Sequence, residues 1–145
     1  MEFITQAADG RSVRYKDGKR YLWLASLSGP LIPILTVAAF FWLDEHPAVL
    51  LFPLFYIFVL IPLADAIFGE DGHNPPEEVV ALMAADQFYR VLPYVGLVLL
   101  YAQFFVVAWF IGTDAAPWWA YLALALGTGF TSAGSILIGH ELGHK

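Results

Sequence analysis

The stretch that decides the fold class is Val91 to Ile111, VLPYVGLVLLYAQFFVVAWFI, which contains no charged residue. An α-helix rises 1.5 Å per residue, so roughly 20 apolar residues cross the hydrocarbon core of a bilayer. Three further stretches have the same character: Leu22 to Leu43, Ala48 to Ile67, and Pro117 to Ile138. The sequence therefore predicts an all-α integral membrane protein with four transmembrane helices.

Composition supports this class and excludes others. Of the 145 residues, 59% are hydrophobic and only 14% are charged, whereas about a quarter are charged in an ordinary soluble domain. Cysteine is absent, so any metal ion must be held by histidine or carboxylate side chains. The net charge of -6, without a basic stripe, argues against nucleic acid as a partner.

Prolines interrupt the first two apolar stretches. Pro30 and Pro33 lie in the first stretch, and Pro53 and Pro62 lie in the second. Proline lacks a backbone N–H group and clashes with the preceding turn of a helix. We expect both helices to be bent.

The distribution of Lys and Arg predicts the orientation in the membrane. All seven cationic residues fall on one side of the four-span topology: Arg11, Arg14, Lys16, Lys19, Arg20, Arg90 and Lys145. Because cytoplasmic loops carry an excess of positive charge, we expect residues 1–21 to form a cytoplasmic segment, followed by a transmembrane domain over residues 22–145. Trp42, Trp118 and Trp119 then fall at the opposite interface.

The polar connection between the second and third stretches contains a helix signal near residues 75–90. Asn74 can cap a helix, Pro75 suits its first position, and Glu77 completes a capping pattern. We expect a short amphipathic helix at the membrane interface. The alternative is a solvated acidic linker.

The motif His140-Glu141-Leu142-Gly143-His144 follows the fourth stretch. Histidines four residues apart lie on one face of a helix and can bind one metal ion. Imidazole suits zinc, copper and iron, so the spacing does not name the metal. The simpler alternative is that two histidines end a helix, where its dipole favours positive charge.

Small residues recur every four positions along the fourth stretch: Ala123, Gly127, Thr131, Ser135, Gly139 and Gly143. Such a ridge allows a neighbouring helix to approach closely. His140 and His144 lie on the adjacent row with Thr128 and Ser132. We expect both histidines to point into the helix bundle.

The pattern H-E-x-x-H is also the signature of zinc proteases, in which the glutamate activates water. Glu141 would then be the catalytic base of a membrane-embedded zinc metalloprotease. A histidine-rich iron oxygenase fits the motif equally well. A transporter that moves or senses a cation through the paired histidines is a third, non-enzymatic alternative.

Four segments of the chain resemble the membrane-bound alkane 1-monooxygenases, the AlkB-like alkane hydroxylase family. They are Lys19 to Trp23 (KRYLW), Asp65 to Val80 (DAIFGEDGHNPPEEVV), Tyr89 to Leu92 (YRVL) and Gly139 to Lys145 (GHELGHK). Their order along the chain makes the resemblance far more specific than H-E-x-x-H alone.

The resemblance implies a six-helix bacterial inner-membrane enzyme that contains two non-haem iron ions. It implies terminal hydroxylation of medium-chain n-alkanes with O2, with electrons supplied by rubredoxin and its reductase. His140 and His144 match the first histidine box and would be iron ligands. The sequence ends at Lys145, before the later histidine boxes, so we expect this N-terminal portion to be inactive alone.

Other residues are candidates for supporting roles. Asp65, near the predicted cytoplasmic end of the second stretch, could accept the second N–H of a metal-bound imidazole, and Glu141 could do the same or bind iron. Gln103 is expected to form hydrogen bonds between helices. Candidates for an apolar substrate tunnel are Leu54, Phe55, Phe58 and Ile61.

Overall fold

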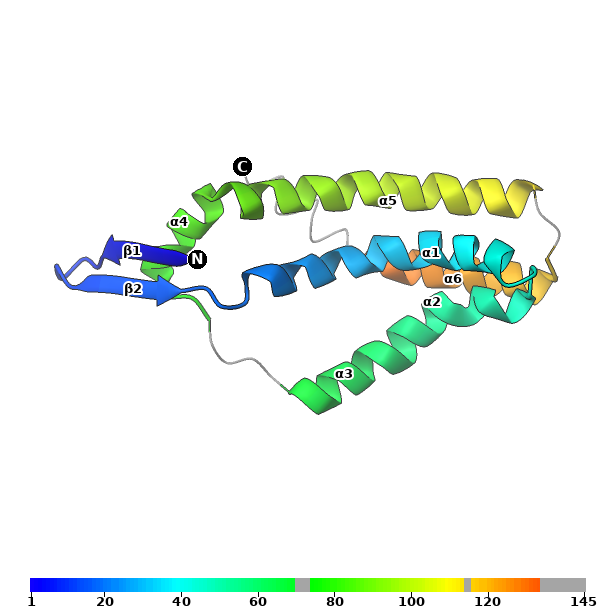
Figure 1. Cartoon of the computed structure of the whole chain (residues 1–145), viewed down its shortest axis with the longest axis horizontal. Coiled ribbons are helices and arrows are strands. Elements are labelled where there is room, and N and C mark those ends of the chain that lie inside the picture. Colours follow the sequence, from blue (N-terminus) through cyan, green and yellow to red (C-terminus); the bar gives the residue numbers. More distant parts are fainter. Residues whose placement is uncertain (70–73, 114–115, 134–145) are drawn as a thin grey trace.

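A computed structural model describes residues 1–69, 74–113 and 116–133. Its helices form an elongated bundle, with a small β-hairpin beyond one end (Figure 1). Three helical stretches are long and apolar enough to cross a membrane: Arg20–Trp42, Pro47–Phe68 and Gln87–Thr113. The helical membrane class is therefore confirmed, whereas the fourth span and the six-helix bundle remain predictions.

The helix expected to be the fourth span is α6 (Trp118–Ala133). It packs against α1 and α2. The described part of α6 has 16 residues, fewer than the roughly 20 that cross a bilayer. The rest of the expected span, up to Ile138, lies outside the described residues.

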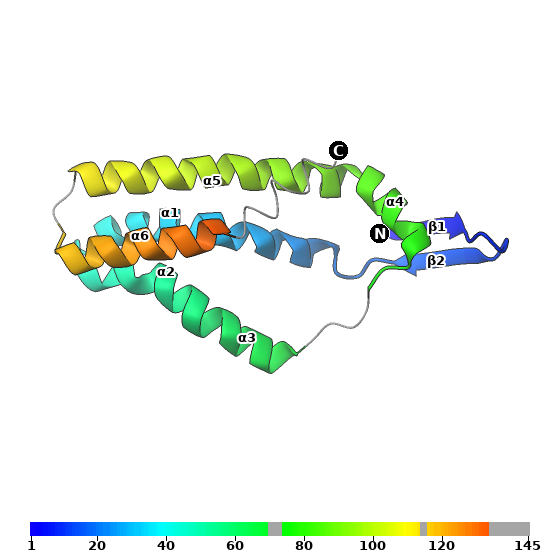
Figure 2. The same ribbon diagram turned by 180° about the vertical axis from the view of Figure 1, so that it is seen from behind.

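The first two helical stretches each change helix type along their length, whereas the bends expected at their prolines remain a prediction. The first begins as the 3-10 helix η1 (Arg20–Leu27) and continues as α1 (Ser28–Trp42). The second consists of the 3-10 helix η2 (Pro47–Leu51), α2 (Phe52–Phe55), the π-helix η3 (Tyr56–Leu60) and α3 (Ile61–Phe68). Pro53 and Pro62 lie near the points where α2 follows η2 and α3 follows η3. Figures 1 and 2 show α3 slanting away from α6.

The helix expected near residues 75–90 is shorter than predicted. It is α4 (Glu77–Ala85), and α5 (Gln87–Thr113) begins immediately after Asp86. The predicted cap by Asn74 is wrong, because Pro76 occupies the N-cap position and no side chain caps the helix. The third span also begins before the expected Val91, since residues 87–90 already belong to α5.

The N-terminal segment corrects the expectation of an all-α chain. Strands β1 (Glu2–Gln6) and β2 (Ser12–Lys16) pair antiparallel, with Phe3 opposite Tyr15 and Thr5 opposite Val13. Gly10 adopts a φ of 82° in the connecting turn, a conformation that glycine adopts without steric cost. The hairpin buries Phe3 against Val79 and Met83 of α4.

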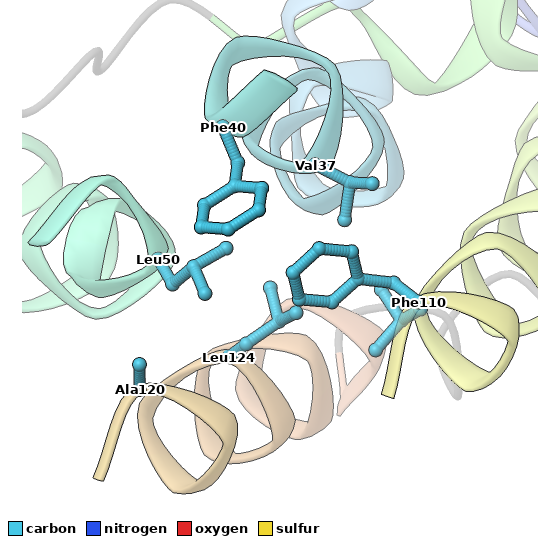
Figure 3. Packing of buried hydrophobic residues seen from close by; sticks show 7 residues of the cluster. Val37, Phe40, Leu50, Phe110, Ala120 and Leu124 are labelled. Carbon is cyan, nitrogen blue, oxygen red and sulfur yellow. The ribbon is translucent and has the colours of Figure 1, made fainter. Parts of the chain in front are cut away.

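The core of the bundle lies where α1, η2, α5 and α6 meet. Its buried residues are Val37, Phe40, Leu50, Val107, Phe110, Ala120 and Leu124. Figure 3 shows the labelled members of this group pointing toward one another. The rings of Phe40 and Phe110 meet edge to face, with centroids 5.0 Å apart, a preferred geometry for an aromatic pair.

Candidate functional site

The histidine motif, with His140, Glu141 and His144, lies outside the described residues. Among the residues that the structure describes, no group of three or more His, Cys, Asp or Glu side chains could hold a metal ion. The helix that leads toward the motif, α6, is described as far as Ala133. The placement of both histidines therefore remains a prediction.

The small-residue ridge of α6 faces its neighbours over the described residues. Ala123, Gly127 and Thr131 are all buried. A Cβ atom added at Gly127 would lie 2.5 Å from the Cβ atom of Pro53 and 3.2 Å from the backbone nitrogen of Leu54. Glycine is thus required where α6 crosses α2, and this part of the predicted ridge is confirmed.

Gln103 connects α5 to α6. Its side chain is completely buried, and its Nε2 atom donates a hydrogen bond to Ser132 Oγ at 2.6 Å. Nε2 also lies 3.4 Å from the carbonyl oxygen of Thr128, and Oε1 accepts a hydrogen bond from Thr131 Oγ1 at 3.4 Å. The predicted role of Gln103 in hydrogen bonding between helices is confirmed.

Polar contacts also join α1 to the second span near the same part of α6. Ser28 Oγ and Tyr56 Oη lie 2.5 Å apart. A Cβ atom added at Gly29 would lie 3.4 Å from the carbonyl oxygen of Thr131. We call Ser28, Tyr56, Gln103, Thr131 and Ser132 the polar layer. Sequence analysis missed Ser28 and Tyr56, although isolated hydroxyl groups within apolar spans are a signal for contacts between helices.

Asp65 lies on α3 and is exposed. None of the residues of α3 is buried. Because His140 and His144 lie outside the described residues, the predicted hydrogen bond from Asp65 to an imidazole remains untested.

The four candidates for the substrate tunnel occupy different surroundings. Leu54 is half-buried beside Gly127, whereas Phe55, Phe58 and Ile61 are exposed. Phe55 lines an open groove of about 560 Å³ between α1 and the η2–α2 segment, whose other lining residues are apolar apart from Thr36. Phe58 instead packs edge to face on Phe130 of α6, with ring centroids 5.2 Å apart. Their role in a tunnel remains a prediction.

A second group of polar contacts lies where the hairpin meets the starts of η1 and α5. Arg20 donates a hydrogen bond to Asp86 Oδ1 at 2.8 Å, and its guanidinium lies 4.5 Å from the ring centroid of Phe88. Asp86 Oδ1 also accepts the backbone N–H of Phe88 at 2.9 Å, which caps the first turn of α5. The Arg20 hydrogen bond, followed by that of Phe88, holds the pKa of Asp86 below its ordinary value.

Asp17, which directly follows strand β2, connects the hairpin to the start of α5. It is buried, accepts the hydroxyl of Tyr89, and accepts the backbone N–H of Lys19 at 2.9 Å. We call the hairpin, α4 and these contacts the cap. Sequence analysis missed it, because Asp17 and Tyr89 lie 72 residues apart in the chain and no sequence spacing predicts a contact between them.

Comparison with known proteins identifies relatives of the chain. No family model matches it. An alkane 1-monooxygenase of Pseudomonas putida is 39% identical over 90% of the chain, and one of Ectopseudomonas oleovorans is 40% identical over 90%. Alkane 1-monooxygenase 1 of Alcanivorax borkumensis is 38% identical over 95% of the chain.

These relatives are much longer than the chain. The matched segment covers 32% of the Pseudomonas and Ectopseudomonas proteins and 34% of the Alcanivorax protein, so the chain spans about a third of their length. The similarity nevertheless extends over 90–95% of the chain itself. The resemblance of the chain to the AlkB-like alkane 1-monooxygenases is therefore confirmed over nearly its whole length.

Proposed function

We propose that the chain is part of a membrane monooxygenase that hydroxylates the terminal carbon of medium-chain n-alkanes with O2. The observation that carries this proposal is 38–40% identity, along 90–95% of the chain, to proteins named alkane 1-monooxygenase. The apolar helices suit this substrate, because an alkane has no polar group and partitions into the bilayer. An apolar site would select it by shape.

The proposed cofactor is a pair of non-haem iron ions, with His140 and His144 as two of the ligands. The donor chemistry of the chain fits, since it offers histidine and carboxylate but no cysteine, and imidazole is a suitable iron ligand. Iron would supply the redox chemistry that breaks a strong C–H bond, which zinc lacks. Glu141 is proposed either to bind iron or to accept an imidazole N–H.

The proposed orientation places the cap in the cytoplasm, at the inner membrane of a bacterium. The cap contains most of the cationic residues, and the opposite end of the bundle carries Trp42 and Trp118, which are 83% and 75% exposed. Positive charge on the cytoplasmic side and tryptophan at the interface favour this orientation. Rubredoxin, reduced by its reductase, would then deliver electrons from the cytoplasm.

Asp65 is proposed to orient an iron-bound imidazole by accepting its second N–H group. Its position near the end of α3, on the proposed cytoplasmic side, supports this role. Asp65→Asn should lower both the iron content and the turnover of the enzyme. Unchanged iron content and turnover would show that Asp65 is only an exposed carboxylate at the end of a helix.

Leu54, Phe55, Phe58 and Ile61 are proposed to line the path of the alkane. The support is their apolar surface on the irregular second span and, for Phe58, its contact with α6. The zinc-protease alternative gains no support from the relatives, which are named as monooxygenases.

The proposal can be tested with a chimera, in which the chain replaces the matched 137-residue segment of the Pseudomonas putida relative. Membranes containing the chimera should convert n-octane to 1-octanol when supplied with O2, rubredoxin, its reductase and NADH. His140→Ala should abolish the product, and the chimera should contain iron and not zinc. Zinc in place of iron, or an inactive chimera that is correctly inserted, would contradict the proposal.

A further inference from the structure

A pocket of about 390 Å³ lies between the cap and the start of the first span. Its volume falls within the range of small-molecule sites, roughly 300–1,000 Å³. The residues that line it include Asp17 and Lys19 after strand β2, Trp23 on η1 and Met83 on α4. The pocket therefore lies at the boundary between the polar cap and the membrane-spanning helices.

Asp17 is the buried charged residue of this pocket, with only 4% of its surface exposed. Its carboxylate accepts the backbone N–H of Lys19 at 2.9 Å and the hydroxyl of Tyr89. Both donors are neutral, and within the described ranges no cationic group forms an ion pair with this carboxylate. A carboxylate can accept about four hydrogen bonds, and a buried charge without a counter-charge is costly. Asp17 therefore has room for a cation and is stabilised by one.

The surroundings of Asp17 favour an organic ammonium ion over a metal ion. Calcium and magnesium take about six or more oxygen ligands, and nowhere in the described part of the chain do three His, Cys, Asp or Glu side chains come together as metal ligands. The aromatic residues Tyr15 and Trp23 also line the pocket. Aromatic rings attract ammonium groups through cation–π interactions. One carboxylate with two aromatic neighbours therefore suits an amine.

The position of the pocket indicates which kind of amine reaches it. The first apolar stretch begins at Arg20, and two residues of its first turns, Leu22 and Trp23, line the pocket. They are 69% and 53% exposed, and tryptophan is typical of the interface between membrane and water. A ligand that extends from the pocket along η1 therefore meets apolar surface in the bilayer. Such a ligand is an amphiphile with a cationic head.

We propose that this pocket binds the headgroup of a phospholipid with a primary ammonium group, phosphatidylethanolamine. The ammonium group donates to the Asp17 carboxylate, the phosphate accepts from the Lys19 ammonium group, which has three donors, and the acyl chains extend along Leu22 and Trp23. Phosphatidylcholine has no N–H group to donate, and phosphatidylglycerol has no cation for Asp17. The site therefore selects the ethanolamine headgroup over both. It involves neither the histidine motif nor an alkane, so it is independent of the proposed function.

Native mass spectrometry of the 145-residue chain tests this selectivity by counting the lipids that the chain retains. The chain is mixed in detergent with equal amounts of phosphatidylethanolamine, phosphatidylcholine and phosphatidylglycerol that carry the same acyl chains. We expect one phosphatidylethanolamine molecule to be retained several-fold more often than either other lipid. Equal retention of the three lipids would overturn the proposal. Displacement of the lipid by an equal concentration of O-phosphoethanolamine would do so as well, because the ligand would then be a soluble amine.

Two variants act on the pocket in different ways. Asp17→Asn removes the negative charge and should abolish the preference for phosphatidylethanolamine. Ser26→Leu fills the pocket from η1 without touching the hydrogen bonds of Asp17, since the Ser26 hydroxyl bonds within η1 to the Trp23 carbonyl oxygen, and it should lower the retention of phosphatidylethanolamine to that of phosphatidylcholine. Asp44→Asn, at an exposed carboxylate beyond the other end of α1, is the matched control and should keep the preference. Even if Asp17→Asn loosens the cap, a full preference in Ser26→Leu would contradict the proposal.

Lipid binding should also protect the cap, because a ligand that binds only the folded state stabilises it. In nanodiscs, amides of residues 1–19 and 77–90 should exchange hydrogen several-fold more slowly when phosphatidylethanolamine replaces phosphatidylcholine. Ser26→Leu should remove this difference, and the amides of α6 should exchange equally in both lipids. Equal protection of the cap in the two lipids, or a difference that Ser26→Leu retains, would show that the pocket does not hold the headgroup.

Discussion

The bundle and the cap each contain an apolar cluster, but different forces hold the two together. The cluster around Phe40, Phe110 and Leu124 lies within the membrane-spanning helices, whereas Phe3, Val79 and Met83 meet outside them. Lipid is as apolar as the side chains of the bundle, so contacts there depend on close packing and on hydrogen bonds. The cap removes apolar surface from water and gains about 25 cal/mol per Å².

The two ends of the second span illustrate the same difference within the bundle. Both ends are apolar, but Leu50 is fully buried whereas no residue of α3 is. The end formed by η2 and α2 packs against α6 where Ala120, Ala123 and Gly127 present little side chain. In the membrane, small residues and complementary shape decide which helices touch, and hydrophobicity alone does not.

The largest expected effect is the loss of packing at Phe110. Phe110→Ala removes a ring that is completely buried between α1 and α6, and such changes cost about 3–5 kcal/mol in soluble cores. We expect a loss of stability near the lower end of that range, because apolar surface that becomes exposed here meets lipid and not water. Thermal unfolding in nanodiscs should show the loss, and Phe105→Ala, at a residue 65% exposed on the same helix, should change stability little. Equal effects of the two variants would contradict a packed core.

A smaller effect is expected where α6 crosses α2. Gly127→Ala must displace Pro53 or the backbone of α2, and overpacking of this kind costs about 1–3 kcal/mol. Gly129→Ala is the matched control, because an added Cβ atom there meets nothing within 4 Å. Since alanine favours a helix over glycine, this control should be neutral or slightly stabilising in the same unfolding measurement. A neutral Gly127→Ala would show that α6 does not approach α2 so closely.

Sequence analysis succeeded where a single helix carries the signal. The apolar stretches predict their spans by composition, the spacing of Ala123, Gly127 and Thr131 predicts a packed ridge, and a lone Gln103 in an apolar span predicts a partner on another helix. Each of these signals is local and strong, because a bilayer leaves few alternatives to a helix with satisfied polar groups.

The cap was not predictable in the same way. Thr5, Val13 and Tyr15 have strand propensity and Asp9-Gly10 suits a turn, but a short hairpin is marginal without packing. The hairpin packs against α4, and that contact joins residues far apart in the sequence. The Asn74 capping pattern failed because the helix begins later, at Glu77. Asp86 was overlooked because its role depends on Arg20, which lies 66 residues away.

Acid should separate the cap from the bundle, and this is the smallest effect that we predict. Arg20 and the Phe88 N–H group hold the pKa of Asp86 below its ordinary value near 3.8, so the folded state favours the carboxylate. Its contribution to stability is therefore fully present above pH 3.8 and is lost as the pH falls through the lower folded-state pKa.

Hydrogen–deuterium exchange should show several-fold faster exchange in residues 1–19 and 77–90 at pH 3 than at pH 6, after correction for the intrinsic pH dependence of exchange. The amides of α1 and α6 within the bundle should stay protected at both values. The share of Asp86 in this response is the part that Asp86→Asn removes. If Asp86→Asn retains the whole response, or if the bundle amides lose protection first, the contact between Arg20 and Asp86 does not hold the cap in place.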